Sequence, residues 1–200
     1  MQNGFVDVGA SIPNILTEVR YATNHNLTGA PLAGYHAQKI FLTKEAAQAL
    51  AKANHMANQV GYQLLLYDGY RPQKAVDTFV SWAAAPEDNT TKAEFYPNVD
   101  KKDMFKLDYI AKKSGHTRGS TIDLTLVKNG QPVDMGTAFD FMDEKSHHGA
   151  KGLSMSVRFH RLILKNIMAL CGFRTIPSEW WHYTLINEPY PDKYFNFDIE

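Results

Sequence analysis

This sequence has little cysteine, no long apolar run and no excess of charge of one sign. It has one cysteine, Cys171, so no disulfide can form within the chain. It has no run near the about 18 apolar residues of a membrane span, and its start lacks the basic-then-apolar pattern of a signal peptide. Neither sign of charge prevails, because 21 Lys and Arg residues balance 21 Asp and Glu residues, which argues against nucleic-acid and membrane partners. We expect a cytoplasmic protein, or a periplasmic one if a signal has been removed.

What is present is an ordinary globular composition. Hydrophobic residues make up 44% of the 200 residues, which is enough for a sizeable core in a single domain. Apolar residues at helical spacing over 43–60 and 154–170, each followed by a glycine, predict two long helices. A third helix is expected after Pro72, whose missing N–H is not needed in a first turn.

Strands are expected between these helices. The apolar run 62–68, the alternating run 120–127 and the C-terminal run 180–186 each have the length and composition of a strand. Asn129 and Gly130 predict a hairpin turn, and the polar stretch 85–113 predicts a loop with a short helix near 104–110. This mixture indicates an α+β fold, a small antiparallel sheet flanked by helices.

The segment "SGHTRGSTIDLTL", residues 114–126, places polar groups in and beside a predicted strand. Asp123 lies between Ile122 and Leu124, so the alternation of side chains along a strand sends it to the opposite face. That face is either solvated or the floor of a cleft. His116 precedes it by seven residues in a turn made flexible by two glycines.

A second polar group lies near the C-terminus in "SEWWHY", with Glu179 three residues before His182. A catalytic zinc needs three protein ligands, an open position for water and a nearby carboxylate for the proton. His116, Asp123 and His182 would supply the ligands, and Glu179 the base. Because positions i and i+3 face opposite sides of a regular strand, we expect Glu179 in the turn before the strand.

A third element is "YDGYRP", which follows a predicted strand and precedes a predicted helix. Arg71 is therefore expected at a strand end. Two interpretations remain open: an ion pair with Asp68 at the surface, or a guanidinium directed at negative charge that develops in a zinc-centred cleft.

Together these motifs resemble those of a known family. "YDGYRP", "SGHTRGSTIDLTL", "DMGTAFD", "SHH" and "EWWHY" occur in this order in the D-alanyl-D-alanine dipeptidases, the VanX-like zinc peptidases, and "RYATNHNLTG" resembles their N-terminal segment. The resemblance extends from Arg20 to Tyr183. The metal set alone is shared with D,D-carboxypeptidases and hedgehog-type domains, whereas the joint pattern is specific to the dipeptidases.

The resemblance implies a single zinc dipeptidase domain over residues 1–200, with a hedgehog/D,D-peptidase-like fold. It implies hydrolysis of the small substrate D-Ala-D-Ala to two D-alanines by a zinc-bound water that Glu179 activates, with the oxyanion stabilised by zinc and Arg71. One Zn²⁺ would be held by three ligands. The site residues it implies are His116, Asp123 and His182 for the metal, Glu179 and Arg71 for catalysis, and Asp140, Ser114, Tyr21 and Asp68 for the substrate, with Asp140 as the anchor for the substrate ammonium.

Two rival functions remain. A carboxypeptidase or endopeptidase acting on peptidoglycan would keep the zinc and change the substrate, and a hedgehog-type binding module would have lost catalysis. The presence of both Glu179 and Arg71 argues against the binding module. The sequence leaves the oligomeric state open, and also whether the role is vancomycin resistance, cell-wall recycling or use of D-alanine as a nutrient.

Overall fold

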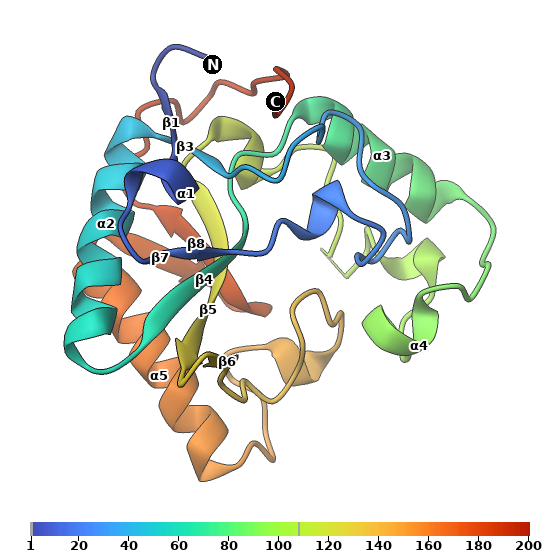
Figure 1. The fold of residues 1–200 in the computed structure, drawn as a ribbon. Helices are drawn as coiled ribbons and strands as arrows, with labels where there is room; N and C mark the ends of the chain where they lie inside the picture. The colour runs from blue at the N-terminus through green and yellow to red at the C-terminus, as the bar shows by residue number, and fades with distance from the viewer. Residues whose placement is uncertain (1, 108) are drawn as a thin grey trace.

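The computed structural model describes residues 2–107 and 109–200. The chain combines helices with short strands, which confirms the α+β prediction (Figure 1). In chain order the elements are β1 Phe5–Asp7, α1 Val8–Ser11, β2 Leu16–Thr17, η1 Arg20–Ala22, β3 Phe41–Thr43, α2 Lys44–Gln59, β4 Gln63–Asp68, α3 Gln73–Ala84, α4 Lys92–Phe95, η2 Lys101–Asp103, η3 Gly115–Arg118, β5 Thr121–Lys128, β6 Gln131–Pro132, η4 Glu144–Ser146, α5 Met155–Leu170, β7 Phe173–Ile176 and β8 Glu179–Leu185, where η marks a 3₁₀ helix.

The two long helices begin and end where their local sequence predicts. The hydroxyl of Thr43 accepts a hydrogen bond from the backbone N–H of Ala46 at the start of α2, and Ser154 caps α5 in the same way. Such caps satisfy backbone donors that have no partner within the helix. Gly61 and Gly172 follow the helices with positive φ angles, which glycine adopts without strain.

The main sheet has the strand order β2-β4-β5-β8-β7, with β6 paired to β5, while β1 and β3 form a separate pair. All described pairs of the main sheet are antiparallel except β2 with β4, which is parallel. The prediction of an antiparallel sheet is therefore right apart from this edge. The chain between β2 and β4 passes through α2, and a helical crossover of this kind allows parallel pairing.

Strand β5 lies in the interior. Its first seven residues are all buried, so both faces of the strand are covered. Helices α2 and α5 pack side by side on one side of the sheet, and α3 and α4 lie on the other (Figure 1). Asp123 is therefore enclosed, and the solvated-face alternative does not hold.

The region 85–113 contains short helices at other places than expected. Helices α4 and η2 lie before residue 104, and the described part of 104–110 forms turns. No helix in the described ranges combines the length and the apolar content needed to cross a bilayer.

The C-terminal segment bonds to both the N-terminal part and the middle of the chain. Ile199 bridges to Tyr35, and the backbone N–H of Phe195 donates to the carbonyl of Thr117. The carbonyl of Phe195 in turn accepts from the N–H of Gln73. One backbone position thus links η3 to the start of α3.

Candidate metal centre and active site

Three elements bring the predicted metal ligands together. Asp123 of β5 stands directly opposite His182 of β8 in the antiparallel register, and His116 lies in η3 just before β5. His116 Nε2 lies 3.3 Å from His182 Nδ1 and 3.2 Å from Asp123 Oδ2. One potential ligand atom from each residue lies within 4.8 Å of the others. Residues separated by 66 positions, His116 and His182, therefore meet at one point.

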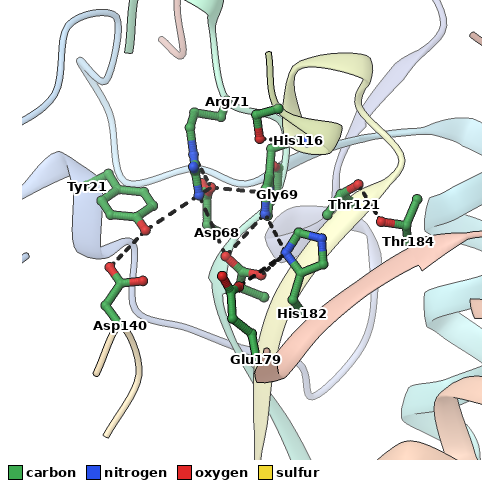
Figure 2. Close-up of polar contacts among 12 residues, drawn as sticks. Tyr21, Asp68, Gly69, Arg71, His116, Thr121, Asp140, Glu179, His182 and Thr184 are labelled. Atoms are coloured by element: carbon green, nitrogen blue, oxygen red, sulfur yellow. Dashed lines mark hydrogen bonds and ion pairs between the residues drawn. The ribbon is translucent and has the colours of Figure 1, made fainter. Parts of the chain in front are cut away.

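The donor set fits zinc. Two imidazole nitrogens and one carboxylate are the ligand types of catalytic zinc sites. The carbonyl of Gly69 accepts a 2.7 Å hydrogen bond from His116 Nδ1, which leaves Nε2 facing the other two residues (Figure 2). Asp123 Oδ1 is buried without a hydrogen bond from any described residue, although it lies 3.2 Å from His182 Nδ1. A cation between these atoms would satisfy them all.

Asp123 is suited to remain ionised. Burial alone would raise the pKa of its carboxyl group, but the adjacent His116 and His182 rings outweigh burial and hold the pKa below its usual value. An ionised carboxylate is the form that binds a metal.

Glu179 lies beside this cluster, with its carboxylate 3.7 Å from His182 Nδ1. It is the first residue of β8, so the expectation that it precedes the strand is wrong. Thr175 pairs with Tyr183 while Ile176 pairs with Glu179, so three residues of β8 bulge out between the two pairs. The bulge breaks the strict alternation, which lets Glu179 and His182 face one site. Burial raises the pKa of Glu179 to about 7.

Arg71 connects the metal cluster to a second buried network. Its guanidinium forms two bonds with Asp68 Oδ2, from Nε at 3.0 Å and Nη2 at 2.9 Å, and Nη2 lies 3.7 Å from Asp123 Oδ2. Asp68 also accepts a 2.6 Å hydrogen bond from the hydroxyl of Tyr35. The Arg71–Asp68 pair therefore exists but is buried, and it aims the guanidinium at the metal cluster.

Asp140 and Tyr21 form the opposite wall of the site. The Tyr21 hydroxyl donates a 2.8 Å hydrogen bond to Asp140 Oδ2 and lies 3.5 Å from Arg71 Nη2 (Figure 2). Burial, reinforced by the charge of Asp123, raises the pKa of Asp140 to about 8. Asp140 has a positive φ of 61°, which is uncommon for a residue with a side chain.

These residues surround one cavity of about 180 Å³. Ser114 lines it and also accepts a hydrogen bond from the backbone N–H of His116, so it helps to shape η3. Asp68 is not part of the lining, because both of its oxygens are turned toward Arg71 and Tyr35. In this structure the contacts of Asp68 hold Arg71 in place, and its expected contact with the substrate stays a prediction. The apolar lining includes Leu27, Val76, Phe79, Ile110, Met142 and Trp181.

Sequence reasoning missed three contributors. Tyr35 and Gly69 support Asp68 and His116, and Tyr109 lines the cavity with its hydroxyl 3.4 Å from His147 Nε2. Gly69 stands inside "YDGYRP" and could have been noticed there. Nothing in the local sequence around Tyr35 or Tyr109 indicates these contacts.

The family model described as D-ala-D-ala dipeptidase matches residues 1–200. The chain belongs to this family. It is 49% identical over 201 residues to a D-alanyl-D-alanine dipeptidase of Enterococcus faecalis, and 46% identical over 202 residues to one of Enterococcus faecium, with 100% of both chains covered in each case.

A solved structure shows a more distant likeness. It is a vancomycin-resistance D,D-pentapeptidase VanY mutant in complex with Zn(II), which aligns with a TM-score of 0.45 at 13% identity over 76% of this chain and 77% of that chain. Membership of the dipeptidase family rests on the sequence matches.

Proposed function

We propose that this member of the dipeptidase family hydrolyses D-Ala-D-Ala to two molecules of D-alanine, acting as one domain with one zinc ion. The observation that carries the proposal is the convergence of a His-Asp-His donor set, a buried carboxylate and a guanidinium on a single cavity. The full-length relatives named D-alanyl-D-alanine dipeptidase support the choice of substrate.

His116, Asp123 and His182 would hold the zinc ion, which when bound supplies an acidified water and polarises the substrate carbonyl. Glu179 takes a proton from the attacking water as the new C–O bond forms. It returns a proton to the leaving amine as the C–N bond breaks. The proximity of its pKa to neutrality suits both steps, because the carboxyl group must release the proton that it has just accepted.

Arg71 stabilises negative charge on the oxygen of the scissile carbonyl. Its guanidinium is held by Asp68 and stacks on the rings of Tyr21 and Phe79, with the guanidinium carbon 4.7 and 5.1 Å from the ring centroids. A donor fixed before the reaction does not have to reorient as charge develops.

Asp140 selects the free ammonium of the dipeptide. A buried carboxylate is stable as an ion only with a cation beside it, and the ammonium of the substrate would supply that cation. Tyr21 holds the carboxylate in place through its hydroxyl. A carboxypeptidase would instead need room beyond this point for the rest of a peptide chain.

The test compares D-Ala-D-Ala with N-acetyl-D-Ala-D-Ala on the zinc-loaded enzyme, measuring release of D-alanine. Acetylation removes the charge and adds bulk next to Asp140, so kcat/KM should fall by about a hundredfold or more. Asp140→Asn should narrow this gap, mainly by weakening cleavage of the free dipeptide. Equal kcat/KM for the two substrates in the wild-type enzyme would refute the dipeptidase assignment and favour a carboxypeptidase.

A further inference from the structure

Helix α5 carries a buried guanidinium that has no carboxylate partner among the described residues. Arg161 is 4% exposed and donates to three backbone carbonyls. Its Nε donates to Met135 at 2.8 Å, its Nη1 to His147 at 2.7 Å and its Nη2 to Lys145 at 2.8 Å. The cation therefore binds only main-chain oxygen atoms.

Such an arrangement has to be maintained against a desolvation cost. A buried cation without a countercharge is stable only when its donors are satisfied. Burial lowers the pKa of Arg161 to about 10, so the group stays protonated at neutral pH. A planar guanidinium presents its donors at fixed angles, so it holds three carbonyls in one relative geometry, which a lysine ammonium on a flexible stem does less well.

The three carbonyls bracket the segment that carries Asp140. Met135 precedes it, and Lys145 and His147 follow it, so Arg161 ties together the two ends of the loop 135–147. Within the loop, Asp140 has a φ of 61°. A residue in this conformation persists only where its surroundings determine the backbone.

The side chain of Asp140 depends on that backbone for its position beside Tyr21. Other bonds also hold the loop: Trp180 Nε1 donates to the hydroxyl of Thr137 at 2.8 Å, and the N–H of Met142 donates to the carbonyl of Phe95 at 2.7 Å. Asn98 Nδ2 donates to Asp143 Oδ2 at 2.7 Å, so Arg161 is the group that joins the two ends, not the sole anchor of the loop. Neither Arg161 nor Trp180 is part of the cavity lining, whereas Asp140 and Met142 from the loop are. Arg161 therefore does not contact the cavity, and any effect that it has on the cavity passes through the loop.

We propose that Arg161 is a positioning residue for substrate selection: by clamping both ends of the loop 135–147 it holds Asp140 where it meets the free ammonium of the dipeptide. The inference rests on the proposed function of Asp140. It assigns the specificity of the enzyme in part to a residue of α5 that does not contact the substrate.

The test measures kcat and KM of zinc-loaded Arg161→Met, Arg161→Lys and Arg158→Met for both D-Ala-D-Ala and its N-acetyl derivative. Arg158→Met is the matched control, since Arg158 lies one turn earlier on α5, is exposed, and takes part in no ion pair within the described ranges. All variants are assayed at a temperature where circular dichroism shows them folded.

In Arg161→Met, KM for D-Ala-D-Ala should rise about tenfold or more, because charged hydrogen bonds that order the loop are lost, while kcat stays within about threefold. The preference for the free dipeptide should fall by a similar factor. Arg161→Lys, which keeps a cation and part of the bonding, should lie between Arg161→Met and wild type, and Arg158→Met should equal wild type.

The inference can fail in two distinguishable ways: Arg161 has no effect on substrate preference, or the wild-type enzyme has no such preference. If wild type prefers the free dipeptide and Arg161→Met keeps that preference and KM despite a lower unfolding temperature, Arg161 is only structural. If Arg161→Met does not fold, the same result in Arg161→Lys decides against the inference. If wild type shows no preference, the role of Asp140 itself fails and the inference fails with it.

Discussion

At the scale of single residues, the site contains carboxyl groups whose surroundings shift their acidities in opposite directions. The two histidine rings hold the pKa of Asp123 low, whereas burial raises the pKa of Glu179 to about 7 and that of Asp140 to about 8. Asp123 is thus suited to bind a metal, Glu179 to exchange a proton, and Asp140 to become ionised when a cation binds beside it. Three residues of the same chemical class thus differ in acidity because their environments differ.

Glu179→Gln should keep the fold and the metal but lose turnover, since the amide has the same shape and cannot accept the proton. We expect kcat to fall by about 10²–10⁴-fold, the usual contribution of a general base. Zinc content by atomic absorption and kcat by D-alanine release are measured on the same preparation. Near wild-type kcat in zinc-loaded Glu179→Gln would remove Glu179 from the base assignment.

Variants of the three proposed metal ligands should lose zinc, unlike the Glu179 variant. Wild-type protein should contain about one zinc per chain, and His116→Ala, Asp123→Ala and His182→Ala should each lose most of it in competition with a chelator, since three protein ligands are the usual minimum of a catalytic site. His148→Ala is the control, because its ring lies outside the ligand cluster. A ligand variant that retains zinc as firmly as His148→Ala would be excluded from the set.

At the scale of elements, the turn from β4 into α3 determines where two functional groups lie. Gly69 sits in this turn, and its carbonyl orients His116 while the next residues lead to Arg71. A Cβ atom at Gly69 would lie 2.6 Å from Ile40 Cγ2 and 2.8 Å from the carbonyl oxygen of Phe41. Phe41 is itself bonded at 2.7 Å to the N–H of Tyr70, so there is little room for the turn to move.

Gly69→Ala should therefore displace the turn and disturb both functional groups. Loss of a hydrogen bond that orients a metal ligand typically lowers metal affinity by about 10–100-fold, and we expect this together with a lower kcat. Zinc affinity by competition titration and kcat at saturating zinc are the measurements. Gly149→Ala is the control, since nothing lies within 4 Å of its added Cβ. Unchanged zinc affinity in Gly69→Ala would show that the turn absorbs the methyl group.

At the scale of the whole molecule, the candidate metal centre joins parts of the chain that are far apart in sequence. Its candidate ligands come from η3, β5 and β8, and the C-terminal segment adds backbone bonds from Phe195 to η3 and to the start of α3. A ligand that binds only the folded chain stabilises it by mass action. Zinc should therefore contribute to the stability of the entire fold.

Removal of zinc should lower the unfolding temperature. At free zinc near 100 times its dissociation constant the stabilisation is about 2.7 kcal/mol. For a chain of this length that corresponds to a shift of about 5–11 °C in Tm. Calorimetry with chelator and with restored zinc measures the shift, and His182→Ala should show none. Equal Tm values with and without zinc in the wild-type protein would contradict a metal site that spans these elements.

The elements that could be predicted from the sequence are those with local signals. Helices α2 and α5, strand β5 and the turn at Asn129 and Gly130 follow from periodicity, caps and turn residues, which act over a few positions. The order of the motifs also indicated the family and the candidate site residues. These are properties that short stretches of chain carry without reference to their neighbours in space.

How these stretches meet depends on packing between elements that are distant in the sequence. The alternation of side chains allowed Asp123 to face either solvent or the floor of a cleft. The burial of β5 on both faces excludes the solvated face. The bulge in β8 brought Glu179 into the strand and onto the side of His182. The burial of Asp68 behind Arg71 and the clamp of Arg161 on the Asp140 loop likewise depend on residues distant in the chain. Registers, bulges and buried polar bonds are set by packing between elements, and a local pattern does not contain that information.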